Sequence, residues 1–195
     1  MGYYAVIFTG ILKAGGASLN FFDVIICGAG PAGSTCGRIL ATKGLKVLIV
    51  DKEKFPRYKP CAGGLTGRSL QELGPGWESY VEDKIEEVIF YHQQKNPLVL
   101  NFSRPVVQMV SREKLDNWLL QQAVAAGARF YDGCQVQEVV EDGKGVRVRC
   151  MDGSSYRANF LVGADGARSL VRKSLGFAVE CLPGIALAAE VGVDG

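Results

Sequence analysis

Several features that would identify particular classes of protein are missing from this sequence of 195 residues. It has no run of five or more basic residues, and 22 Lys and Arg against 20 Asp and Glu leave a net charge of +2. Electrostatics therefore give no reason to expect nucleic acid as a partner. No apolar run is long enough to span a bilayer. The composition, 48% hydrophobic and 22% charged, is that of a globular protein and excludes disorder and coiled coil.

Metal-ligand clusters and nucleophile elbows are also missing, so we expect no metal site. The single histidine, His92, has no acid at triad-like spacing, and we interpret it as a surface or core residue. The cysteines contain no C-x-x-C pair and are scattered through a chain too long to need disulfides; they are Cys27, Cys36, Cys61, Cys134, Cys150 and Cys181. We therefore expect reduced thiols in a cytoplasmic compartment.

Glycine is the residue in excess, with 25 in 195, against a usual frequency of about 7%. No collagen-like period accounts for these glycines, so they must serve turns and close approaches of the backbone. A length near 200 predicts one large domain or two small ones, with enough chain for a real core. Residues 1–20 contain one short apolar run with no basic residue before it, so we expect an extension outside the fold rather than a signal peptide.

The first firm feature is a predicted βαβ unit. Residues 21–27 form an apolar run of strand length that ends directly in a glycine-rich turn. Helix-compatible residues follow from Pro31 to about Lys43, and Gly44 ends this helix. A second buried strand, 45–50, ends at Asp51.

The rest of the chain predicts a long loop, an antiparallel insertion and a return to the sheet. Residues 52–76 are rich in Pro, Gly and Lys, and a loop this long inside a domain is usually functional. An insertion at about 78–110 carries short strands with polar breaks, and Ser111 caps a helix to about Ala126. The strands expected are 85–91, 98–102, 106–110, 129–131, 135–141, 145–150 and 160–163, and a short helix is expected at 169–175.

The first motif with chemical content is Gly28-x-Gly30-x-x-Gly33, between the first predicted strand and helix. Dinucleotide binding needs the first glycine for a tight turn, the second so that a pyrophosphate can approach the backbone, and the third for close packing of the helix. It also needs an acid at the end of the next strand, here Asp51, to bind ribose hydroxyls. A carboxylate there would repel a 2′-phosphate, so the sequence predicts FAD or NAD. The alternative is a structural turn that holds no ligand. The other cofactor-site candidates in these segments are Ala29, Pro31, Ala32 and Lys52.

The second motif is Gly163-Ala164-Asp165-Gly166, between a predicted strand and a short helix. Alone it is equally typical of a plain turn. Together, the two motifs resemble the flavoprotein monooxygenase and reductase superfamily, the p-hydroxybenzoate hydroxylase-like flavoproteins. The resemblance implies an α/β fold: a Rossmann-like FAD-binding domain (GR2-type) with an antiparallel β insertion. It implies FAD as the cofactor, with Asp165 and Gly166 near the flavin.

The third motif is the loop from Phe55 to Leu65, which carries two cations, a thiol and a glycine pair. Its Lys59-Pro60-Cys61-Ala62-Gly63-Gly64 segment resembles the K-P-C-G-G-G segment of the geranylgeranyl reductase family, with Ala62 in place of a glycine. The resemblance places Cys61 near the flavin at the substrate site, and we add Ala62 and Gly63 to the cofactor site. The alternative for Cys61 is a small buried hydrophobic side chain.

Two further residues are cofactor-site candidates by the same resemblance. Arg112 matches the superfamily arginine at the start of the helix that crosses the FAD, and its alternative is a solvated surface arginine. Val136 lies on a strand that offers backbone to the adenine in that superfamily. The cysteines other than Cys61 are interpreted as structural.

The resemblance implies an FAD-dependent oxidoreductase that reduces carbon-carbon double bonds of an isoprenoid (geranylgeranyl) chain, with NADPH or ferredoxin as electron donor. Hydride from N5 of reduced flavin would reach one alkene carbon while an acid protonates the other, and Cys61 is the candidate catalytic donor or gate. The expected partner is an isoprenoid lipid, with peripheral membrane contact. The oligomeric state is left open.

Three alternatives stay open: an FAD-dependent aromatic-ring monooxygenase, a non-catalytic nucleotide-binding fragment or remnant, and an NAD-dependent dehydrogenase. The last explains neither the second motif nor the Cys61 loop. The resemblance covers roughly the first half of a family member, because the later G-D and aromatic-proline motifs are missing. We therefore expect an extension at 1–20, the FAD-binding domain at 21–180 and the start of a second, substrate-binding domain at 181–195, apparently truncated.

Overall fold

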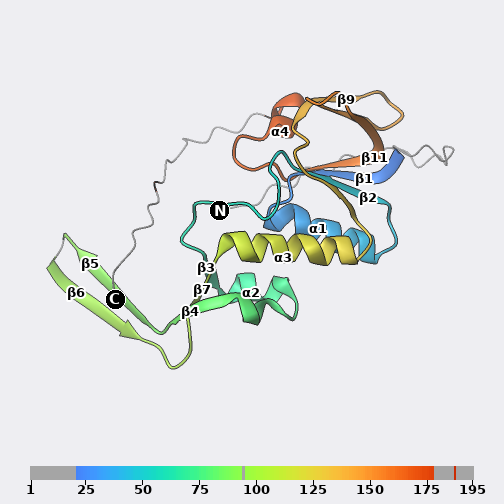
Figure 1. Cartoon of the computed structure of the whole chain (residues 1–195). Coiled ribbons are helices and arrows are strands. Elements are labelled where there is room, and N and C mark those ends of the chain that lie inside the picture. The colour runs from blue at the N-terminus through green and yellow to red at the C-terminus, as the bar shows by residue number, and fades with distance from the viewer. Residues whose placement is uncertain (1–20, 94, 178–186, 188–195) are drawn as a thin grey trace. The chain divides into compact units, whose positions relative to one another are not determined.

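The computed structural model describes residues 21–93, 95–177 and 187, and Figure 1 shows its elements. The expected extension at 1–20 lies outside the described residues, as does the expected start of a second domain at 181–195 apart from Leu187. The chain divides into two compact units, which are described one at a time. Of the described residues, 21–57 and 116–177 belong to the first unit, and 58–93, 95–115 and 187 belong to the second.

Among the described residues, the first unit contains a mixed sheet of six strands in the order β8-β2-β1-β11-β10-β9. Neighbours in the first four positions pair in parallel, while β10 pairs antiparallel with both β11 and β9. The strands are β1 (Phe21–Cys27), β2 (Val47–Val50), β8 (Arg129–Tyr131), β9 (Val136–Glu141), β10 (Val146–Cys150) and β11 (Ser155–Gly163). The parallel half is the Rossmann-like part that the sequence predicts.

Helices cover this sheet because its central strands are apolar on both sides, as parallel strands usually are. One core joins Val24 and Ile26 of β1 to α1 (Pro31–Thr42) and to the C-terminal part of α3 (Arg112–Ala125). The opposite core joins Ile25 and neighbouring β-strand residues to α4 (Leu170–Ser174). In Figure 1, α1 and α3 run below the sheet, while α4 lies above it.

The second unit is antiparallel where its strands pair, as the sequence predicts for the insertion. Among the described residues, β3 (Gly64–Thr66), β7 (Val107–Val110) and β4 (Val81–Ile85) form one small sheet in that order. A separate hairpin pairs β5 (Glu87–His92) with β6 (Lys95–Asn101). The helical elements here are α2 (Gly67–Leu73) and a 3-10 turn, η1 (Trp77–Tyr80).

Sequence patterning does not predict β4. Its residues, V-E-D-K-I, place three charged side chains in a row, and all three are exposed. Pairing with β7, which carries the apolar residues, holds this stretch in strand conformation. Tertiary pairing here overrides a weak local preference, as is usual for strands.

The expectation of reduced thiols is wrong for one pair. Cys134 and Cys150 form a disulfide, with Cα atoms 5.8 Å apart. Cys134 directly precedes the β9–β10 hairpin and Cys150 ends it, and the pairing of Val136 with Cys150 brings the two thiols together. Both cysteines are buried in the core that also contains β1 and β11.

The described cysteines outside the disulfide have different environments. Cys27 is buried, Cys36 is half-buried and Cys61 is exposed. The interpretation of Cys61 as a small buried side chain is therefore wrong. Cys181 lies outside the described residues.

Candidate cofactor-binding site

The first and third glycines of the loop after β1 are required for packing. Gly28 has φ +104°, and a Cβ on it would lie 2.3 Å from the carbonyl oxygen of Ala164. A Cβ on Gly33 would lie 1.8 Å from the carbonyl oxygen of Gly28. Any side chain at either position would collide with backbone, so the loop, the start of α1 and the Gly163–Gly166 turn fit together only with glycine there.

Gly30, the middle glycine, could carry a Cβ without a clash. Within the described part of the chain, a Cβ there would have one atom within 4 Å, Nη2 of Arg57 at 3.7 Å. Gly30 caps α1, Pro31 begins the helix, and the first turn of this described helix has no acidic side chain. The positive end of the helix dipole is therefore available to an anion such as a pyrophosphate. Of the neighbouring candidates, Ala29 is buried and Ala32 is exposed.

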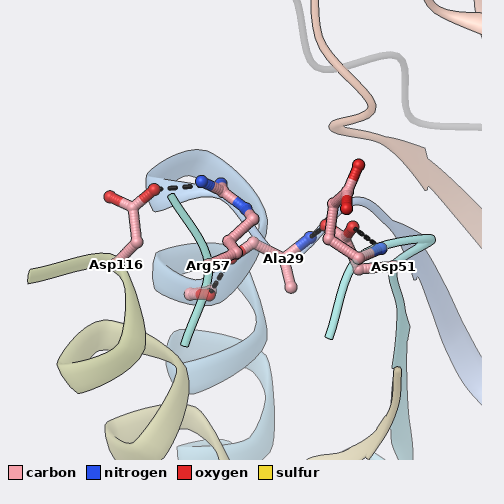
Figure 2. Close-up of polar contacts among 6 residues, drawn as sticks. Ala29, Asp51, Arg57 and Asp116 are labelled. Carbon is pink, nitrogen blue, oxygen red and sulfur yellow. Dashed lines mark hydrogen bonds and ion pairs between the residues drawn. The ribbon is translucent and has the colours of Figure 1, made fainter. Parts of the chain in front are cut away.

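Asp51 lies at the end of β2 and is bonded to the glycine loop (Figure 2). Its Oδ2 accepts a hydrogen bond from the backbone N–H of Ala29 at 2.7 Å, and its Oδ1 accepts one from Glu53 N–H at 2.9 Å. A carboxylate has about four lone-pair sites, so it keeps acceptor capacity for ribose hydroxyls. The adjacent Lys52 is exposed and lies 3.7 Å from the carboxylate of Glu53.

Asp165 in the second motif has a structural role that the sequence does not assign. Its Oδ2 accepts hydrogen bonds from the backbone N–H groups of Leu170 at 2.7 Å and Val171 at 3.2 Å, which caps α4. Its Oδ1 is buried and has no hydrogen-bond partner among the described residues. Gly166 has φ +83°, which suits the turn.

The two motifs lie against each other, as the contacts of Gly28 with the Ala164 backbone require. The Cys27 carbonyl joins the same junction, since it accepts a hydrogen bond from the Ala164 N–H at 2.7 Å. Burial and the nearby charge of Asp165 raise the pKa of the Cys27 thiol far above its ordinary value. Cys27 is therefore a neutral packing residue, which agrees with its structural interpretation.

The sequence interpretation missed one ion pair, Arg57 with Asp116 (Figure 2). Nη2 of Arg57 donates to Oδ2 of Asp116 at 3.0 Å, and the Asp116 side chain is fully buried while that of Arg57 is 13% exposed. The guanidinium also lies 4.8 Å from the ring centroid of Phe55. The sequence analysis noted the cations of the loop that contains Arg57, but it gave no reason to pair Arg57 with an acid 59 positions away.

Three candidates from the loop motif belong to the second unit. Gly63 has φ +76°, and a Cβ on it would lie 2.0 Å from the carbonyl oxygen of Val110, so only glycine fits. Val110 N–H donates to the Gly63 carbonyl at 3.0 Å, which ties the loop to β7. Cys61 and Ala62 are exposed, and Gly63 N–H lies 3.5 Å from Sγ of Cys61.

The last two candidates lie on separate elements. Arg112 is the first residue of α3, where the carbonyl of Ser111 accepts the Leu115 N–H at 2.9 Å, and Arg112 is half-buried. Val136 begins β9, two residues after Cys134, whose N–H donates to the Asp51 carbonyl at 2.9 Å. The first unit thus brings Asp51 close to Gly28–Gly33 and to the segment leading into Val136.

Comparison with known proteins identifies the family. A family model described as an FAD binding domain matches residues 22–194. The chain belongs to this FAD-binding domain family. Among sequence relatives, the FAD-binding domain is 36% identical over 173 residues to an uncharacterised protein of Methanosarcina barkeri. The aligned region covers 84% of this chain and 44% of that protein.

Other relatives extend the comparison. The domain is 34% identical to a probable electron transfer flavoprotein-quinone oxidoreductase of Escherichia coli K12, over 80% of this chain and 39% of that protein. It is also 34% identical to protein FixC of the same strain, over 85% of this chain and 41% of that protein. The chain therefore spans less than half the length of these curated relatives.

Solved structures agree on the fold. A geranylgeranyl bacteriochlorophyll reductase-like protein from Thermoplasma acidophilum matches with TM-score 0.62 and 24% identity, over 71% of this chain and 37% of that one. Aklavinone-11 hydroxylase in complex with FAD and aklavinone matches with TM-score 0.61 and 29% identity, over 80% of this chain and 35% of that one. The predicted α/β, Rossmann-like FAD-binding domain with antiparallel elements is confirmed.

FAD is the dinucleotide that fits this family and this site. The space beside Gly30 and the uncompensated start of α1 suit a pyrophosphate, and Asp51 suits a ribose. The prediction of FAD and of an oxidoreductase family is confirmed, while the family shown is broader than geranylgeranyl reductases, because FixC and a quinone oxidoreductase are among the relatives. Within the described part of the chain, no helix has both the length and the apolar character needed to cross a bilayer.

Proposed function

We propose that the chain is the FAD-binding part of an oxidoreductase that reduces carbon-carbon double bonds of an isoprenoid chain. The observation that carries this proposal is the exposed thiol of Cys61, in a loop anchored by Gly63 to β7. An exposed thiol in a glycine-fixed loop is available to a substrate, whereas the described Cys27 and Cys36 are wholly or partly buried. The electron donor belongs to the same proposal, as NADPH or ferredoxin.

The chain's own residues would bind and orient the cofactor. Gly30 and the N-terminal end of α1 would hold the pyrophosphate, and Asp51 would accept hydrogen bonds from a ribose. The candidates Val136, Asp165 and Gly166 of the same unit would complete its part of the site, and Arg112 of the second unit stays a separate prediction. When bound and reduced, FAD supplies the hydride for the reduction.

Cys61 is proposed as the proton donor to the second alkene carbon or as a gate that excludes water. An unactivated alkene has no carbonyl to polarise, so orientation and exclusion of water should contribute more to catalysis than acid strength. The anchored loop suits that role because its conformation is fixed by a glycine that tolerates no side chain. The exposed apolar side chains of the β5–β6 hairpin support an isoprenoid lipid as partner and peripheral membrane contact.

A second candidate function is electron transfer to a quinone. The 34% identity to a probable electron transfer flavoprotein-quinone oxidoreductase favours it. Both candidates use FAD and an apolar acceptor, and they differ in the bond that is reduced. The monooxygenase alternative is favoured by the 29% identity to aklavinone-11 hydroxylase.

One assay separates these functions. The FAD-loaded protein is reduced anaerobically with NADPH or reduced ferredoxin and mixed in turn with a geranylgeranyl substrate, a short-chain quinone and oxygen with an aromatic substrate. Flavin reoxidation together with a hydrogenated geranylgeranyl product in mass spectrometry supports the proposal. Reoxidation by the quinone alone supports the second candidate, and a hydroxylated product supports a monooxygenase. A protein that stays colourless after incubation with FAD supports a non-catalytic fragment.

The role of Cys61 is tested in the same assay by Cys61→Ser, with Cys36→Ser as the matched control. We expect Cys61→Ser to lower turnover by about 100-fold, the usual contribution of a positioned proton donor, without changing FAD affinity. Cys36→Ser should leave turnover close to that of the unaltered protein. Unchanged turnover and product pattern in Cys61→Ser would remove Cys61 from the mechanism.

A further inference from the structure

Arg57 has hydrogen-bonding capacity that the described residues do not use. Its Nη2 donates to Asp116, but its Nη1 is buried and has no hydrogen-bond partner among the described residues. A guanidinium carries five N–H donors in a fixed plane, and leaving buried donors unmet costs free energy. This group is therefore a candidate to receive an acceptor from outside the protein.

The guanidinium lies beside the phosphate cradle. Its Nη2 is 3.7 Å from the point that a Cβ on Gly30 would occupy, and apart from Gly30 and its chain neighbours it is the one described atom within 4 Å of that point. In Figure 2 the Arg57 side chain lies between Asp116 and the glycine loop at Ala29. The Cβ position of Gly30 thus lies within van der Waals range of a cation, next to the start of α1.

Arg57 is also held in place before any ligand arrives. The fully buried carboxylate of Asp116 fixes one edge of the guanidinium, and the ring of Phe55 lies 4.8 Å away. Phe55 in turn packs edge-on against Phe130, with ring centroids 5.7 Å apart. A guanidinium restrained in this way loses little entropy when it binds, so its geometry favours tight recognition of an oxyanion.

We propose that Arg57 is a phosphate-binding residue of the dinucleotide site and that Asp116 is its positioning residue. The ligand class is the diphosphate of an adenine dinucleotide, which the space beside Gly30 and the start of α1 also suit. The inference rests on the proposed cofactor site. It assigns to the loop after β2 a charge that the glycine motif lacks, since that motif offers only backbone N–H groups.

The test compares ADP, which has the diphosphate, with adenosine, which lacks it, by isothermal titration calorimetry at two salt concentrations. Arg57→Gln should weaken ADP binding about tenfold and leave adenosine binding unchanged, because one charge-assisted hydrogen bond is lost. The salt dependence of ADP binding should fall in the same variant. Arg57→Lys should restore part of the ADP affinity, and Asp116→Asn should lower it by a smaller factor.

Arg147→Gln is the matched control. It makes the same charge change at an exposed position of β10. Arg147 pairs with Arg157 of β11, and Arg157 pairs with Phe21 of β1. Phe21 lies at the end of β1 opposite to the glycine loop, so the control position is far from the proposed site. We expect its affinities for ADP and adenosine to equal those of the unaltered protein. Thermal unfolding of every variant separates loss of binding from loss of fold.

The outcomes distinguish this inference from the site on which it rests. If the ratio of ADP to adenosine affinity is unchanged in Arg57→Gln, with or without a lower Tm, Arg57 is a structural residue. That result overturns the proposal for Arg57 and leaves the proposed cofactor site unaffected. If Arg57→Gln does not fold, an unchanged ratio in Arg57→Lys has the same meaning. Failure of the unaltered protein to bind ADP overturns the cofactor site together with this inference.

Discussion

Glycine residues in one motif differ in what a side chain at each position would touch. Gly33 faces the carbonyl of Gly28 so closely that a Cβ would overlap it, whereas the Cβ position of Gly30 is open apart from Arg57. Gly30 also has φ −68°, a value that any residue adopts. The protein itself therefore needs glycine at position 33, whereas at position 30 we predict that glycine leaves room for the ligand.

This difference predicts opposite effects of two alanine substitutions. Gly33→Ala should lower the free energy of unfolding by about 3 kcal/mol, because the new methyl group collides with backbone. Gly30→Ala should leave stability unchanged and weaken FAD binding about tenfold, because the methyl group occupies the approach of the pyrophosphate. Urea unfolding and FAD titration measure the two effects.

Gly67→Ala is the control for both variants, since a Cβ there meets nothing within 4 Å. We expect it to change neither stability nor FAD affinity. Equal FAD affinity in Gly30→Ala and the unaltered protein would contradict the placement of the pyrophosphate.

The β9–β10 hairpin shows how an element can carry a feature that its sequence pattern hides. Its two strands, expected at 135–141 and 145–150, follow from alternating apolar residues, and the structure confirms them. The disulfide between Cys134 and Cys150 depends on the pairing register instead. Because the Cys134 N–H also donates to the backbone carbonyl of Asp51, the bridge stabilises the segment next to the residue whose carboxylate is the candidate ribose ligand.

Removal of the bridge should destabilise the protein. Cys134 and Cys150 are 16 positions apart, and closing a loop of this size contributes about 3 kcal/mol by restricting the unfolded chain. The double variant Cys134→Ala/Cys150→Ala should lose about that much in urea unfolding under non-reducing conditions. Dithiothreitol should lower the midpoint of the unaltered protein and leave that of the double variant unchanged. A midpoint that does not respond to reductant in the unaltered protein would refute the disulfide.

Across the whole molecule, burial is distributed unevenly between the two units. Central strands β1 and β2 of the first unit contain side chains at 0–1% exposure, such as Ile25 and Leu48. The β5–β6 hairpin instead exposes Phe90 at 55%, Tyr91 at 63% and Leu98 at 56%. Few buried contacts and a two-strand ladder predict low local stability for this hairpin.

Hydrogen exchange should reveal this contrast. We expect amides of β1, β2 and β11 to exchange at least about 100-fold more slowly than amides of β5 and β6, because the central strands open only with the core. Exchange followed by proteolysis and mass spectrometry gives rates for peptides of similar length from each strand. Equal rates for the two sets would contradict the distribution of burial in the structure.

The sequence by itself determined most of the local elements of the first unit and their order. Apolar runs, glycines and turn dipeptides predict β1, α1, β8 and the β9–β10 hairpin close to their observed bounds, because these signals act over a few neighbouring residues. The glycine motif and the acid at the end of β2 also predict the cofactor class, since their spacing follows from the chemistry of the ligand. The residues that would surround the flavin remain predictions.

Tertiary structure alone decided which distant residues meet. It paired Arg57 with Asp116 across 59 positions and Cys134 with Cys150 across 16, and it held the charged β4 in a sheet. It also turned Asp165 toward the start of α4. No local pattern encodes these contacts, because their stability comes from burial and from pairing partners that only the folded chain brings together.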